Sequence, residues 1–163
     1  MKIFILLAGL LSFSAQASVL EAFFSSLEGN WTAVNAEILR ESAEGELSHS
    51  VGTRFLADVT RTGNRWDFSE DMCWSEEGAP EVCGPARVGW EVEGDSLFAI
   101  VEGERLQVEV LEAHEDQLLI VLSTAHFVFT AVLSLESGEL RQDSVTEMGD
   151  GSREYQFLHL RKR

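Results

Sequence analysis

The sequence predicts an all-β protein, an antiparallel up-and-down β-barrel of about eight to ten strands preceded by one short N-terminal helix. Apolar and polar residues alternate with a period of two nearly everywhere after Trp31. Short turn signals such as Thr62-Gly63-Asn64 and Glu93-Gly94-Asp95 separate the alternating segments, so consecutive strands should be antiparallel neighbours. A sandwich of two sheets is the alternative architecture for the same pattern.

The first 17 residues predict a signal peptide. Lys2 supplies a positive start, Ile3 to Phe13 form an apolar run, and Ala15-Gln16-Ala17 is a small-x-small cleavage site. The run is shorter than the roughly 20 residues that a spanning helix needs. We therefore expect a periplasmic or secreted protein with no stable membrane insertion, whose single domain covers residues 18–163.

Residues 19–27 predict a short amphipathic helix, because their apolar side chains recur at helical spacing. These side chains are Val19, Leu20, Phe23, Phe24 and Leu27. Gly29 ends the helix, since a residue without Cβ tolerates the left-handed conformation that follows many helices. Trp31 then begins the first strand, and we expect it to be buried at one end of the barrel with the helix above it.

The stretch Leu27-Glu28-Gly29-Asn30-Trp31 resembles the Gly-x-Trp motif with which lipocalin and calycin barrels begin. The resemblance implies a lipocalin-like barrel that binds a small hydrophobic molecule. In that family a late arginine stacks on the first tryptophan, and Arg153 and Arg161 are the candidates here. An ordinary junction between a helix and a strand is the alternative interpretation of the motif.

Cys73 and Cys83 are the two cysteines of the chain, and an exported protein meets oxidising conditions. The segment between them is rich in turn residues, so we predict one disulfide across a hairpin. Histidine pairs and CxxC spacing are absent from the sequence around them, and we therefore predict no metal site.

The chain carries 28 acidic and 12 basic side chains, with a formal net charge of −16. Removal of Lys2 with the signal peptide makes it one charge more acidic. Such a surface repels nucleic acids and anionic lipids, because lysine and arginine supply those contacts. The charge favours either solubility alone or a cationic protein partner.

The alternating pattern places one set of large apolar side chains on the inner face of the predicted barrel. We expect a ligand to lie among Trp66, Phe68, Met72, Trp90 and Phe129. Glu70 falls on the same face, where a carboxylate is unfavourable unless it is paired or protonated. It either points inward and orients the polar end of a ligand, or lies at a bulge or at the rim.

The last strand offers a second polar site. Arg153 and Tyr155 share a face and resemble the Arg-x-Tyr carboxylate clamp of the fatty-acid-binding branch of the calycins. In the alternative orientation Leu158 and Leu160 face inward, and Arg153 and Tyr155 lie in water. His159 would be a haem ligand only if it faced a cavity.

Catalytic motifs are weak in this sequence. Gly94-Asp95-Ser96-Leu97 matches the block that names an esterase family, but it lies between two strand patterns, where a hairpin turn explains it. We therefore predict an exported, non-catalytic binding protein with no cofactor that holds a small hydrophobic ligand. The alternative is an acidic module that binds or inhibits a cationic enzyme such as a lysozyme.

Overall fold

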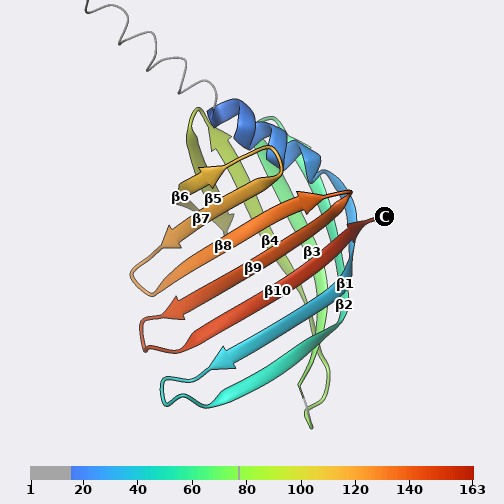
Figure 1. Ribbon diagram of the computed structural model, residues 1–163, viewed down its shortest axis with the longest axis vertical. Coiled ribbons are helices and arrows are strands. Elements are labelled where there is room, and N and C mark those ends of the chain that lie inside the picture. The colour runs from blue at the N-terminus through green and yellow to red at the C-terminus, as the bar shows by residue number, and fades with distance from the viewer. Residues whose placement is uncertain (1–15, 77) are drawn as a thin grey trace, which may run out of the picture.

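The computed structural model describes residues 16–163 apart from residue 77. Within this part of the chain, ten strands form one closed barrel, in which each strand is antiparallel to the next and β1 pairs with β10 (Figure 1). The predicted up-and-down barrel is thus confirmed, and the sandwich is wrong. The strands are β1 (Gly29–Glu41), β2 (Leu47–Thr62), β3 (Arg65–Glu76), β4 (Val82–Glu93), β5 (Ser96–Val101), β6 (Glu104–Ala113), β7 (Gln117–Ser123), β8 (Phe127–Glu136), β9 (Glu139–Met148) and β10 (Arg153–Lys162).

A helix over residues 16–26 lies across one end of the barrel (Figure 1). Its apolar side chains point into the barrel, and Leu20, Phe23 and Phe24 are almost completely buried. Leu27, just beyond the helix, is buried with them. We call the end under the helix the closed end, and the opposite end, where β1 meets β2 and β9 meets β10, the open end.

Trp31 is buried at the closed end, as predicted. Its side chain is 2% exposed, and its Nε1–H donates a hydrogen bond of 2.7 Å to the carbonyl oxygen of Leu27. The cation over its ring is Lys162, whose Nζ lies 5.5 Å from the ring centroid. The expectation that Arg153 or Arg161 fills this place is wrong, because odd-numbered residues of β10 point away from the barrel.

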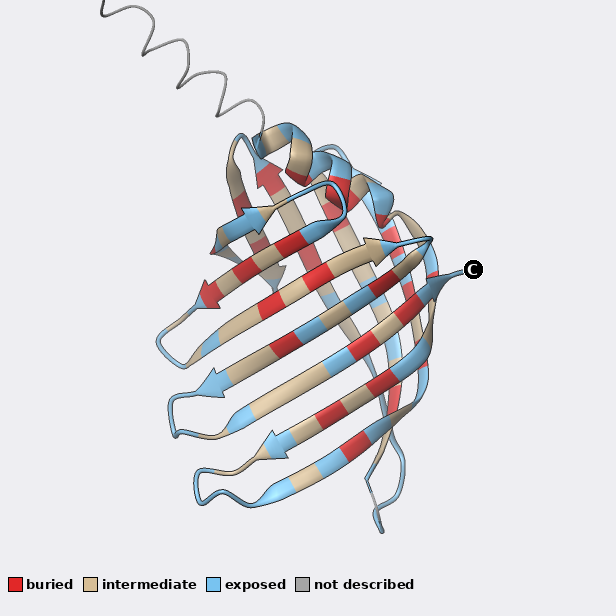
Figure 2. Ribbon diagram, in the orientation of Figure 1, coloured by how far each residue is buried: buried red, intermediate tan, exposed pale blue. Residues whose placement is uncertain are grey.

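β-bulges change which residues face the interior. In β1 the register shifts between Ala33 and Asn35, and in β2 between Gly52 and Arg54. The extra residue at a bulge exchanges the two faces of the strand, so that the residues beyond it alternate in the opposite order. Trp31 therefore faces inward before the bulge in β1 and Ile38 faces inward after it. Figure 2 shows the resulting alternation of buried and less buried positions along the strands.

The hairpin of β3 and β4 carries the disulfide between Cys73 and Cys83, which confirms that prediction. This hairpin projects beyond its neighbours at the open end (Figure 1). The Thr53 hydroxyl from β2 donates to the Glu81 carboxylate and to the Cys73 carbonyl oxygen, which ties the hairpin to the neighbouring strand. Glu81 also lies beside the two sulfur atoms, but sulfurs bonded to each other present no thiolate ligand to a metal.

Residues 1–15 hold most of the predicted signal peptide and lie outside the described residues. Cleavage before Ser18 stays a prediction. Within the described part of the chain, no helix is both long enough and apolar enough to cross a bilayer.

Candidate ligand cavity

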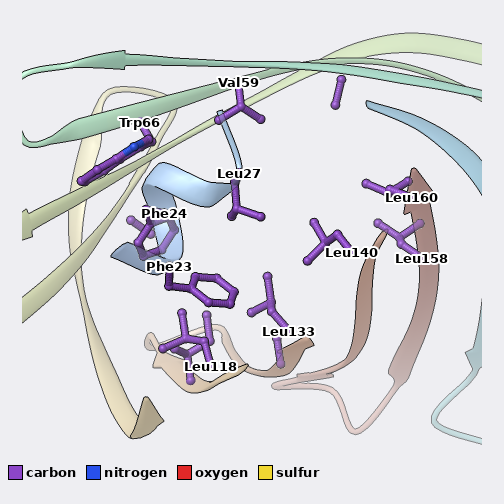
Figure 3. Packing of buried hydrophobic residues seen from close by; sticks show 14 of the residues in the cluster. Phe23, Phe24, Leu27, Val59, Trp66, Leu118, Leu133, Leu140, Leu158 and Leu160 are labelled. Carbon is purple, nitrogen blue, oxygen red and sulfur yellow. The ribbon is translucent and has the colours of Figure 1, made fainter. Parts of the chain in front are cut away.

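The barrel encloses a cavity of about 300 Å³. It extends from Phe24 and Leu27 beneath the helix to Val101 and Phe127, which stand where β5 ends and β8 begins, toward the open end. Figure 3 shows the helix side chains facing inward toward leucines of β8, β9 and β10. The aromatic part of the wall consists of Phe24, Trp31, Phe55, Phe68, Trp90, Phe127 and Phe129.

Two properties of the chain leave this space empty. A ring of ten strands is wider than one of eight, whose interior is only just filled by side chains. Small residues also line part of the wall, with Ala57 on β2 and Ala99 on β5. Three bulky aromatic groups pack against one another at the closed end, where the Phe24 ring lies 5.5 Å from that of Trp66 and 5.7 Å from that of Trp90.

Glu70 on β3 is the one charged residue in the wall of this cavity, within the described residues. Its ladder neighbours are Ala57 and Ala86, and the pairing of β2 with β3 is regular around it. Glu70 is therefore neither at a bulge nor at the rim. Burial among apolar groups raises the pKa of its carboxyl to about 7, because a charge is poorly solvated there. The carboxyl is about half protonated near neutral pH.

The described residues provide no hydrogen bond or ion pair to the Glu70 carboxyl. The other polar members of the wall are Gln142 and Gln156, and the Gln142 amide donates to the Gln156 side-chain oxygen at 3.4 Å. These two amides were missed in the sequence. The signal that finds them is their even spacing from Leu140 and Leu158, two inward residues on the same strands.

At the open end, Arg40 joins a second polar group, although its own side chain is 44% exposed. Its Nε donates to Glu154 at 2.8 Å, and its Nη1 donates to the hydroxyl of Ser50 at 3.1 Å. Ser50 is 3% exposed and is satisfied by this contact. The alternation in the sequence did not reveal this group, because the bulges in β1 and β2 lie between these positions and the closed end and reverse which residues face inward.

The structure brings four of the predicted ligand residues together around the cavity: Phe68, Glu70, Trp90 and Phe129. Trp66 is fully buried at the closed end, where its Nε1–H donates to Glu28 at 3.2 Å. Met72 packs against the edge of the core nearer the β3–β4 hairpin. These last two residues support the barrel and do not form part of the cavity wall.

Arg153 and Tyr155 lie on the outer face, so the predicted carboxylate clamp in the barrel is a misassignment. Gln156, Leu158 and Leu160 are the inward residues of β10, and the strand has no bulge that would reverse the pattern. Arg153 is exposed and forms an ion pair with Glu147 at 3.2 Å. The alternative orientation of this strand is the correct one.

His159 also lies outside the barrel. Its Nε2 is 2.6 Å from a carboxylate oxygen of Glu139, whose other oxygen accepts from Arg161. These contacts lower the pKa of the Glu139 carboxyl. The esterase-like block forms the tight turn between β4 and β5, with Gly94 at a φ of 57°. The hairpin interpretation of that block fits the structure.

Comparison with solved structures places this architecture among known barrels. An S-type phycobiliprotein lyase from Guillardia theta matches with a TM-score of 0.64 and 10% identity, over 88% of this chain and 92% of that one. The barrel is calycin-like. Zebrafish ileal bile acid-binding protein, solved with cholic acid, matches at a TM-score of 0.42 and 11% identity, over 85% of this chain and 99% of that one.

Because this chain and the lyase are only 10% identical in sequence, their likeness concerns the fold alone. No protein-family model matches the chain, and no curated protein matches it in sequence. The function therefore has to be argued from the cavity.

Proposed function

We propose that this chain is an exported, non-catalytic carrier that holds one small hydrophobic molecule inside its calycin-like barrel. The observation that carries the proposal is the cavity of about 300 Å³ with a wall of aromatic and aliphatic side chains. Sites for small molecules are concave and mostly apolar, with a few polar groups that orient the ligand. Transfer of an apolar molecule from water into such a space is favourable.

The wall also suits a role in binding better than one in catalysis. Its polar members are one carboxyl group and two amides that bond to each other. A nucleophile with an adjacent general base is the usual equipment for covalent catalysis, and this wall offers none within the described residues. The alternative role, binding of a cationic protein, is supported by net charge alone.

A matched pair of substitutions tests the proposal. Val88 faces the cavity from β4, whereas Val128 lies on the outer face of β8 and is 38% exposed. The neutral dye Nile red, whose emission changes in apolar surroundings, reports binding directly. We expect saturable binding by the wild-type protein, a loss of about tenfold or more in affinity for V88F, and wild-type affinity for V128F.

Equal affinities of V88F and V128F would place the dye on the outer surface and overturn the proposal. Absence of saturable binding by the folded wild-type protein would do the same.

Export has its own test. The N-terminal residue of the protein recovered from its native cell is expected to be Ser18, which follows the predicted cleavage site. A protein that retains Met1 or Lys2 would contradict export.

A further inference from the structure

The cavity carries a chemical preference that its apolar wall alone does not explain. Glu70 contributes a carboxyl group in the middle of β3, and its strand neighbours Ala57 and Ala86 offer it no polar partner. Within the described residues, neither lysine, arginine nor histidine belongs to the cavity wall.

A second observation concerns the guanidinium group of Arg40, which lies outside the cavity wall at the open end. Arg40 is already bound to Glu154 and to Ser50, toward the open end. A ligand carboxylate in the cavity would therefore lie in a space to which the described residues contribute another carboxyl and no free cation. Like charges in a poorly solvated space repel each other strongly, so the ionised form of Glu70 disfavours anionic amphiphiles.

From these contacts we infer that the cavity selects hydrophobic molecules that carry a single amine, with the ammonium group bound to the carboxylate of Glu70. This inference rests on the proposed function and names its ligand class. The ammonium displaces the proton of Glu70 into solvent and leaves a neutral ion pair. Hydrogen bonds between charged partners are roughly twice as strong as neutral ones, which favours an amine over an alcohol of equal length.

The charge of the whole molecule acts in the same direction. With a formal net charge of −16, the protein attracts a cationic amphiphile toward its surface and repels an anionic one. This long-range attraction weakens as salt rises, whereas the contact at Glu70 is screened much less. Binding measured at high salt therefore isolates the contribution of the cavity.

Three ligands with the same alkyl chain and different head groups test the inference: decylamine, decanol and decanoic acid. Each displaces Nile red from the wild-type protein and from two variants at high salt and below micellar concentrations. In E70Q the carboxyl is replaced by an amide of the same shape. In the control, E109Q, the same charge is lost from an exposed position on β6.

We expect the wild-type protein to bind decylamine at least tenfold more tightly than decanoic acid, with decanol in between. E70Q should lose about tenfold in affinity for decylamine, keep its affinity for decanol, and gain affinity for decanoic acid. E109Q should match the wild-type protein with all three ligands. E70M serves as a second variant, and circular dichroism establishes that each variant is folded.

Equal affinities for the amine and the acid, or an unchanged amine affinity in folded E70Q and E70M, would overturn the inference while leaving the carrier function intact. An equal loss in E109Q and E70Q would assign amine binding to the acidic surface and would also overturn it. If neither Nile red nor decanol binds the wild-type protein, the proposed function itself fails together with the inference.

Discussion

Glu70 makes the stability of the protein depend on pH in a direction opposite to that of most carboxylates. Burial raises the pKa of its carboxyl from 4.5 to about 7 in the folded protein. The folded state therefore binds the proton more tightly than the unfolded chain does. The contribution of Glu70 to the free energy of unfolding is highest below pH 4.5. It falls as pH rises from 4.5 to 7 and is constant above that range.

The size of the effect follows from the two pKa values. The rise in the pKa of Glu70 from 4.5 to about 7 changes the free energy of unfolding by about 3 kcal/mol at most. Of this change, about 2 kcal/mol falls between pH 5.5 and 8. The wall of the cavity adds no other titratable group within the described residues, and Arg40 and Glu154 neutralise each other nearer the open end. The part of the pH dependence that arises in the cavity wall should therefore belong to Glu70.

Comparison of the wild-type protein with E70Q isolates this contribution, because every other titration occurs in both proteins. Urea unfolding followed by tryptophan fluorescence gives the free energy of unfolding at each pH. We expect the advantage of E70Q over the wild-type protein to grow by about 2 kcal/mol from pH 5.5 to pH 8. A difference that stays constant within about 0.5 kcal/mol across this range would refute the assignment of a buried, unpaired carboxyl.

Three further predictions concern the barrel itself. Replacement of Trp31 by Ala should lower the free energy of unfolding by about 3 to 5 kcal/mol because it leaves a cavity at the closed end, and a loss below about 1 kcal/mol in urea unfolding would contradict that role. In G52A the new Cβ would lie 2.6 Å from the Cβ of Ala36, so we expect the free energy of unfolding to fall by about 1 to 3 kcal/mol. In the control G84A the new Cβ has open space, and the same assay should show almost no change. Replacement of both Cys73 and Cys83 by Ser should lower the free energy of unfolding by about 2 to 3 kcal/mol. If the thiols of the wild-type protein react with an alkylating agent without prior reduction, the disulfide is absent.

The amino-acid sequence by itself determined the class of fold. Period-two alternation with short turns leaves only antiparallel neighbours, and the helical spacing of Leu20, Phe23 and Phe24 predicts the element that covers the closed end. The disulfide and the burial of Trp31 followed from the same local patterns. Such features depend on residues close together in the chain, which is why one sequence is enough to predict them.

Tertiary structure decided which face of each strand points inward and whether the interior is hollow. A β-strand has two faces, and a shift of one residue exchanges them, so the bulges in β1 and β2 were needed to bury Ser50 and to bring Arg40 into contact with it. The last strand had two plausible orientations, and only packing against its neighbours put Tyr155 outside and Gln156 inside. The volume of the cavity depends on the number of strands in the closed ring and on Ala57 and Ala99, which come together only when distant strands meet.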